Sequence, residues 1–179
     1  MSQAQLLIDE LVAHNQTISF CESLTAGLAC ATVADVPGAS QALRGGLVTY
    51  ATDLKASVAG VSQSVLDDHG VISPETAREM ARGVRRVCGS TWGVSLTGVA
   101  GPDEQDGHPV GEVYIGISGP AWTAAWPAGE VVDPALAQFR LSSANATPIH
   151  VLTGSRDDIR KNAVAAAING ILRVVREQK

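Results

Sequence analysis

Several residue types are scarce in this sequence, and each shortage excludes a class of protein. The 3 cysteines among 179 residues form no CxxC pair and are odd in number, which disfavours a disulfide framework and a thiolate metal site. The 4 histidines show no HxxxH spacing, so we expect no bound metal. A transmembrane helix requires about 18 consecutive apolar residues, and no apolar run in this sequence is that long, so we expect no membrane association.

Basic residues are outnumbered by acidic ones. With 13 Lys and Arg against 18 Asp and Glu, the formal net charge is -5, and no dense basic run occurs. We therefore expect no nucleic-acid partner, although a single nucleotide needs only a local pocket. Segment 1–15 lacks a basic stretch followed by an apolar one, so we expect a cytoplasmic protein.

What the sequence does contain is an alternation of helical and strand patterns. With 45% hydrophobic residues and no repeat or linker, it predicts one domain over residues 1–179. Helices are predicted over 3–13, 28–34, 74–88 and 155–177, and strands over 17–21, 45–50, 92–97, 112–118 and 122–126. This order predicts α/β architecture, a single three-layer α/β/α domain with a mostly parallel (mixed) central sheet. The last two strands are expected to form an antiparallel hairpin.

Element boundaries are marked most clearly where capping residues occur. Ser73 followed by Pro74 and an acid predicts the start of helix 74–88. Another helix is predicted to begin at Thr52 or Asp53 and to carry Lys55 in its first turn. Residues 127–148 are rich in Pro, Ala, Ser and Asn, so we expect irregular chain there with one strand at 137–141. The small domain and its Ala-rich helix faces favour a homodimer.

Ser23 is the first candidate for chemistry, because it follows a predicted strand and precedes a helix. Free backbone N–H groups and the helix dipole at such a place stabilise a developing anion, which suits a nucleophile. The same position also suits a helix cap, supplied by Ser23 or Thr25. Glycine is absent two residues before Ser23, so the GxSxG elbow is not present. Both interpretations remain open on this segment alone.

Lys55 is the candidate base for such a serine, since no histidine has a context that marks it as one. It follows the end of the second predicted strand, and the carboxyl ends of neighbouring parallel strands meet in one crevice. To act as a base its pKa must fall from about 10.4 to about 7, which burial would achieve. A solvated surface lysine is the alternative. Tyr50 is a candidate for relaying a proton or holding a substrate ring, or is simply a half-buried strand tyrosine.

A glycine-containing segment, 97–102, follows the third predicted strand. Its glycines allow backbone N–H groups to approach an anionic or carbonyl ligand, although a tight turn without function has the same composition. The GxxxxGK[ST] and GxGxxG patterns are absent. The acids Asp103, Glu104 and Asp106 suit either a hard cation or a solvated loop. Arg156 and Arg160, one helical turn apart, suit either a phosphate or pairing with surface acids.

Taken together, these motifs resemble the CinA C-terminal domain family, the nicotinamide-nucleotide amidohydrolases. The resemblance implies the three-layer fold and hydrolysis of nicotinamide mononucleotide to the nicotinate form and ammonia by a Ser/Lys pair, with no cofactor or metal. The motifs that carry it, in order, are Glu22-Ser23-x-Thr25-x-Gly27, Pro37-Gly38-Ala39-Ser40, Gly46-x-Val48-Thr49-Tyr50 with Lys55, segment 54–61, His69-Gly70-x-x-Ser73, Thr97-Gly98-x-Ala100-Gly101-Pro102 and Pro109-Val110-Gly111.

Carried onto this chain, the resemblance makes Ser23 the nucleophile, Lys55 its base and Tyr50 an assisting group, with backbone N–H groups near 25–27 stabilising the oxyanion. The expected partner is a small-molecule nucleotide substrate. Its predicted binding residues are Thr25, Gly27, Thr97, Gly98, Ala100, Gly101 and Arg156. A regulatory nucleotide-binding domain and a Ser/Lys amidase for another small amide are the alternatives.

The chain departs from the family pattern at five positions, one of which is Ser155 in place of the aspartate of the family's Gly-Asp-Arg, and its segment 127–148 is longer than the family's usual connection. Leu24 and Ala26 stand where the family usually has cysteine and glycine, and Asp103 and Glu104 stand where it has more glycine. Acids beside a phosphate repel it. The substrate therefore depends on where these side chains lie.

Overall fold

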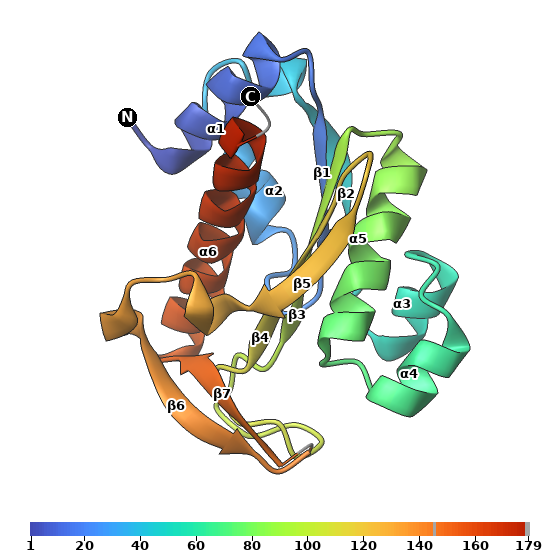
Figure 1. Cartoon of the computed structure of the whole chain (residues 1–179), viewed down its shortest axis with the longest axis vertical. Coiled ribbons are helices and arrows are strands. Elements are labelled where there is room, and N and C mark those ends of the chain that lie inside the picture. Colours follow the sequence, from blue (N-terminus) through green and yellow to red (C-terminus); the bar gives the residue numbers. More distant parts are fainter. Residues whose placement is uncertain (145, 178–179) are drawn as a thin grey trace.

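A five-stranded sheet runs through the centre of the protein (Figure 1), whose computed structural model describes residues 1–144 and 146–177. The strand order is β2-β1-β3-β4-β5. The strands are β1 (Ile18–Glu22), β2 (Leu43–Val48), β3 (Trp92–Gly98), β4 (Val113–Ser118) and β5 (Thr123–Pro127). β2 and β3 flank β1 in parallel, whereas β4 pairs antiparallel with β3 and with β5. Four strands therefore run in one direction and β4 in the other, which is the predicted mixed sheet.

Helices cover both faces of the sheet and make the three predicted layers (Figure 1). α1 (Gln3–Ala13), α2 (Leu28–Ala34) and α6 (Arg156–Glu177) pack together on one face. α5 (Pro74–Cys88) covers the other face, with α3 (Thr52–Ser57) and α4 (Gln63–His69) on its side. Because both faces are covered, every residue of β1 is buried. None of the helices in the described part of the chain has the length and apolar character needed to cross a membrane.

The predicted start of α5 is confirmed in detail, and that of α3 is not. The Ser73 hydroxyl accepts the Thr76 N–H at 3.1 Å, with Pro74 at the first helical position. In α3 the N-cap is Ala51, which makes no side-chain cap bond. Thr52 and Asp53 already lie inside this helix of 6 residues, in which Lys55 is the fourth.

One α-helix, one β-strand and the short 3-10 helices were not predicted. α4 has one buried residue, Leu66, so its sequence carries little helical periodicity. The strand expected at 137–141 is present as β6 (Ala137–Ser142), but it pairs antiparallel with β7 (Thr147–Leu152) in a second, two-stranded sheet. Pro148 is tolerated within β7 because both strands of a two-stranded sheet are edges. Two short 3-10 helices, Ala128–Glu130 and Pro134–Leu136, precede β6, and position 145 lies outside the described residues.

Candidate active site

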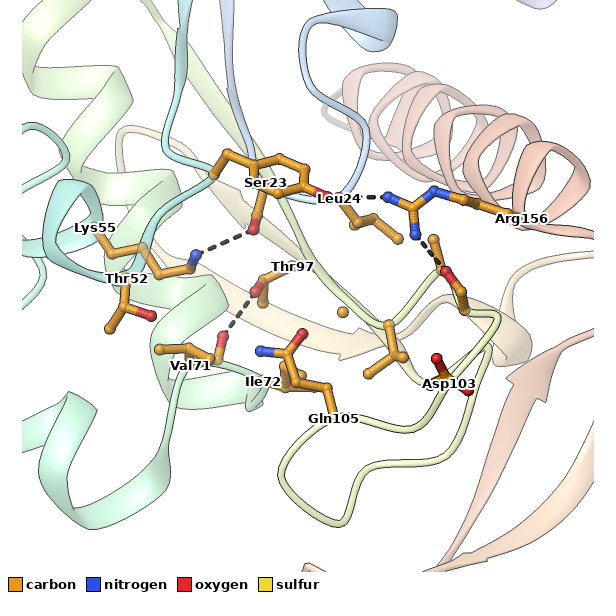
Figure 2. Close-up of a pocket in the computed structure, with 15 residues that line it drawn as sticks. Ser23, Leu24, Thr52, Lys55, Val71, Ile72, Thr97, Asp103, Gln105 and Arg156 are labelled. Carbon is orange, nitrogen blue, oxygen red and sulfur yellow. Dashed lines mark hydrogen bonds between the residues drawn. The ribbon is translucent and has the colours of Figure 1, made fainter.

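Most of the predicted site residues gather where β1 and β3 end, because parallel neighbours bring their carboxyl ends to one edge of the sheet. An open pocket of about 560 Å³, its mouth included, lies at this edge (Figure 2). Its size suits a small molecule. The lining residues are Ser23, Leu24, Tyr50, Thr52, Lys55, Val71, Ile72, Thr97, Gly98, Val99, Ala100, Gly101, Asp103, Gln105 and Arg156.

Ser23 and Lys55 meet inside this pocket. Ser23 directly follows β1, and Lys55 reaches it from α3, which follows β2. The Lys55 Nζ atom lies 3.0 Å from the Ser23 Oγ atom and 3.0 Å from the Thr49 carbonyl oxygen. The Ser23 side chain does not cap α2, whose N-cap residue is Gly27. The alternative interpretation, in which Ser23 only caps the helix, is therefore not supported by the geometry.

The environment of Lys55 favours its neutral form. The residue is only 2% exposed, and burial lowers the pKa of its ammonium group below the ordinary value. Among the described residues, the Lys55 Nζ atom donates to a hydroxyl and a carbonyl oxygen rather than to a carboxylate. A buried lysine without an acidic partner is a candidate base, because its lone pair is available at a lower pH than usual.

The nearby cysteine is a poor competitor for the nucleophile's role. Cys21 lies in β1, two positions before Ser23, and its Sγ atom is 3.5 Å from the Thr49 hydroxyl. Burial raises the pKa of the Cys21 thiol to about 11. The thiolate is the reactive form, so a thiol with this pKa is inert near neutral pH. Ser23 remains the nucleophile that the geometry favours.

A buried carboxylate next to the serine organises the turn into α2. The Glu22 side chain is 1% exposed and accepts the backbone N–H groups of Gly27, Ala29 and Cys30 at 2.9–3.0 Å. This satisfies N–H groups that a helix start leaves without partners. The expectation that the Gly27 N–H stabilises an oxyanion is therefore corrected, since Glu22 already binds it.

The N–H groups of Leu24 and Thr25 remain as donors in the turn after Ser23, because neither donates a hydrogen bond within residues 1–144 and 146–177. The predicted substrate-binding side chain of Thr25 does not line the pocket. It is fully buried, and its hydroxyl has no hydrogen-bond partner among the described residues. Gly27 also lies outside the pocket lining.

Both arginines of α6 bind the site's own chain. Arg160 donates to the Leu24 and Thr25 carbonyl oxygens at 3.0 and 2.9 Å, which holds the turn after Ser23. Arg156 donates to the Tyr50 hydroxyl at 2.9 Å and to the Gly101 carbonyl oxygen. Of the two, only Arg156 lines the pocket. Tyr50 also lines it, but its hydroxyl is hydrogen-bonded to Arg156 rather than to Ser23 or Lys55.

The glycine-containing segment after β3 forms another wall of the pocket. The Thr97 hydroxyl donates to the Val71 carbonyl oxygen at 2.7 Å, which ties the end of β3 to the segment before α5 (Figure 2). Gly101 has φ +87, a conformation that favours glycine. The N–H groups of Ala100 and Gly101 donate to no acceptor in the part of the chain that the structure describes, so they are also available to a ligand.

Comparison with known proteins identifies the family of this chain. A model of the CinA C-terminal domain family matches residues 1–131 of the 179. The chain belongs to the CinA C-terminal domain family. A CinA-like protein of Frankia casuarinae is 49% identical over 113 residues, which are 63% of this chain and 26% of that protein. A Streptococcus thermophilus protein named as competence-damage inducible is 52% identical over 108 residues, covering 60% of this chain and 26% of that protein. This CinA domain therefore spans about a quarter of the length of these curated relatives.

Solved structures of the CinA superfamily share its fold. A competence-damaged protein (CinA) superfamily structure from Enterobacter cloacae superposes with a TM-score of 0.81 at 19% identity, covering 97% of this chain and 90% of that chain. A superfamily structure from Klebsiella pneumoniae gives 0.82 at 19% identity, covering 98% and 96%. At this identity the likeness concerns the fold alone.

Part of the pocket of this CinA domain carried no local signal in the sequence. Val71 and Ile72 line it from the segment before α5, which the Thr97 hydrogen bond ties to the end of β3. Gln105 lines it from the loop after β3 and Thr52 lines it from the first position of α3, and neither residue belongs to a motif that marks it as a site residue. Among the described residues, no group of three or more His, Cys, Asp or Glu side chains is placed to hold a metal ion.

Proposed function

We propose that this CinA domain is an amidohydrolase that converts nicotinamide mononucleotide to nicotinate mononucleotide and ammonia through an acyl-serine intermediate. The observation that carries the proposal is the buried contact of 3.0 Å between Lys55 Nζ and Ser23 Oγ. A serine is a weak nucleophile until a base takes its proton, and this lysine is within proton-transfer distance. Family membership supports the proposal, and the predicted cytoplasmic homodimer remains a prediction.

The proposed reaction begins with Lys55 in its neutral form, oriented by the Thr49 carbonyl oxygen. Its lone pair takes the Ser23 proton while the Ser23 Oγ atom forms a bond to the carboxamide carbon. The carbonyl oxygen becomes an oxyanion, for which the free N–H groups of Leu24 and Thr25, or of Ala100 and Gly101, are the candidate donors. Lys55 then returns the proton to the amide nitrogen, the carbon–nitrogen bond breaks and ammonia leaves.

The acyl-serine is then hydrolysed by the same groups. Water gives a proton to Lys55 and its oxygen adds to the acyl carbon. Collapse of this second oxyanion breaks the bond to Ser23, which regains a proton from Lys55. The product is a carboxylic acid, which gives its proton to solvent and leaves as the carboxylate, so the net reaction consumes one water and releases ammonia.

An ammonia-release assay tests the proposal. Wild-type protein with nicotinamide mononucleotide is expected to release ammonia, and Ser23→Ala and Lys55→Ala are each expected to lower kcat by at least about a thousandfold. Lys161→Ala is the matched control, because Lys161 is an exposed lysine of α6 that pairs with Asp157. It should leave the rate unchanged.

Other results of this assay would point elsewhere. Equal release by wild type, Ser23→Ala and Lys55→Ala would rule out the proposed Ser/Lys pair. Binding of the nucleotide without turnover would favour a regulatory domain. Turnover of other small amides, but not of nicotinamide mononucleotide, would favour a Ser/Lys amidase with a different substrate.

A further inference from the structure

The Gln105 side chain reaches the pocket from a tight turn in the loop after β3. Figure 2 shows its amide directed into the pocket. The Gln105 N–H donates to the His108 carbonyl oxygen at 3.2 Å, and the His108 N–H donates back to the Gln105 carbonyl oxygen at 2.8 Å. Asp106 and Gly107, which lie between them, have φ values of 51 and 79, as a two-residue turn of this kind requires. The position of Gln105 therefore follows that of His108.

The His108 ring anchors this turn to a buried carboxylate. Although residues 102–106 are exposed, His108 is only 8% exposed. Its Nδ1 atom lies 3.0 Å from the Oε1 atom of Glu112, which is fully buried. The approach is not aligned as a hydrogen bond, so the attraction between the two groups is electrostatic. In the described part of the chain, no other group that can carry a positive charge lies within 4.0 Å of this carboxylate.

Tyr114 completes this buried cluster. Its hydroxyl donates to the same Glu112 oxygen at 3.0 Å. Burial, together with the neighbouring carboxylate, raises the pKa of Tyr114, which keeps its hydroxyl protonated as a donor. The other carboxylate oxygen, Oε2, has no hydrogen-bond partner among the described residues. Because a buried charge is unfavourable when it lacks partners, Glu112 depends on its contacts with His108 and Tyr114.

We infer that His108 is a positioning residue, which Glu112 holds in place so that the Gln105 amide meets the bound molecule. An amide both donates and accepts hydrogen bonds, so it can bind a hydroxyl or an amide group of a ligand. Gly101 of the same loop is held separately, by Arg156, so the placement of its N–H group does not depend on His108. The inference rests on the proposed function, because that function supplies the ligand.

Steady-state kinetics with nicotinamide mononucleotide test the inference. His108→Ala and Gln105→Ala are each expected to raise KM about five- to tenfold and to change kcat by less than about threefold, because the proposed nucleophile and base lie on other segments. Since His108 acts through Gln105, the double variant should raise KM by no more than about twofold beyond Gln105→Ala alone. His108→Gln, whose amide can donate to Glu112, should restore KM to within about twofold of the wild-type value. His14→Ala, which changes the exposed histidine after α1, is the matched control and should leave both constants unchanged.

Hydrogen exchange of backbone amides tests the positioning without any ligand. His108→Ala should speed the exchange of the Gln105 N–H at least about threefold, because the acceptor of this N–H is the carbonyl oxygen of the residue that loses its anchor. The N–H groups of Gly27 and Ala29, which Glu22 binds, are the internal reference and should exchange at an unchanged rate. If His108→Ala does not fold, His108→Leu combined with Glu112→Gln takes its place, because it fills the space of the ring and leaves no buried charge unpaired.

The outcomes separate this inference from the proposed function. An unchanged KM in Gln105→Ala, fully additive effects of the two single changes, or an unchanged exchange rate at Gln105 in His108→Ala would each overturn the inference while leaving the amidase intact. If the wild type does not hydrolyse the mononucleotide, the proposed function fails, and the exchange rate alone decides whether His108 positions Gln105.

Discussion

At the scale of single residues, the buried lysine that suits the chemistry is expected to cost stability. Lys55 is 2% exposed, and its ammonium group has no carboxylate near enough to form an ion pair among the described residues. Burying an uncompensated charge is unfavourable, and the same unfavourable free energy lowers the pKa of Lys55. Replacement by an apolar residue of similar length should therefore stabilise the fold and abolish the proposed activity.

We predict that Lys55→Met raises the free energy of unfolding by about 1 to 2 kcal/mol near neutral pH. The gain should depend on pH. Between the lowered pKa of folded Lys55 and the ordinary value of about 10.4, the unfolded chain binds more protons than the folded one, so wild-type stability rises with pH. Lys55→Met lacks this slope, so its advantage should shrink as pH rises. Urea denaturation at several pH values measures it.

The same substitution at an exposed lysine provides the control. Lys161→Met removes a lysine of α6 that lies on the surface, so its stability should change by less than about 0.5 kcal/mol at any of these pH values. If Lys55→Met were less stable than wild type throughout the pH series, Lys55 would be a net stabilising residue. The argument that its burial costs stability would then be wrong.

At the scale of elements, the junction between β1 and α2 depends on Glu22. Its carboxylate binds three backbone N–H groups of the segment that follows Ser23, so it fixes the nucleophile and the first turn of α2 together. Removing it leaves these donors without partners. We predict that Glu22→Ala lowers the free energy of unfolding by about 2 to 3 kcal/mol and lowers kcat more than it changes KM, as urea denaturation and steady-state kinetics would measure.

A cap far from the pocket is the matched control for Glu22. The Ser2 hydroxyl accepts the Gln5 N–H at 3.2 Å at the start of α1. Ser2→Ala should cost about 1 kcal/mol of stability without altering kcat. An equal loss of kcat in Ser2→Ala would mean that general destabilisation, and not the placement of Ser23, accounts for the effect of Glu22→Ala.

Local patterns in the sequence were sufficient to predict the start of α5 and the position of Ser23. The cap at Ser73 predicted the start of α5, and strand-then-helix order placed Ser23 at the end of β1. The parallel arrangement of β1 and β2 then brings Lys55 to Ser23. These steps need only propensity, periodicity and the rule that parallel strands share their carboxyl edge.

Contacts between distant residues were not predictable in the same way. Arg160 binds the carbonyl oxygens of Leu24 and Thr25, across sequence separations of 136 and 135 residues. Nothing in the composition around Arg160 distinguishes this role from phosphate binding, because both use the same guanidinium donors. Glu22 was recognised only as part of a motif, since its acceptor role depends on the exact path of the chain through 27–30.

At the scale of the whole molecule, the pocket is assembled from segments that span most of the chain. Ser23 follows β1, Lys55 lies on α3, Thr97 ends β3 and Arg156 begins α6. A ligand that contacts all four of these residues links both helical layers to the sheet. Because such a ligand binds only the folded chain, its binding free energy adds to the stability of the entire domain.

We predict that Ser23→Ala, which should bind the substrate without hydrolysing it, melts at a higher temperature when a nicotinamide nucleoside or nucleotide is present. At a concentration 100 times Kd, the ligand adds about 2.7 kcal/mol, which for a chain of this size raises Tm by about 5 to 10 °C. Calorimetry over a range of ligand concentrations measures the shift.

Ribose 5-phosphate, which lacks the carboxamide ring, serves as the control and should shift Tm by about 1 °C or less. If it stabilised Ser23→Ala as much as the complete nucleotide, the carboxamide would contribute nothing to recognition, and Ser23 and Lys55 would not be facing the amide of the bound molecule.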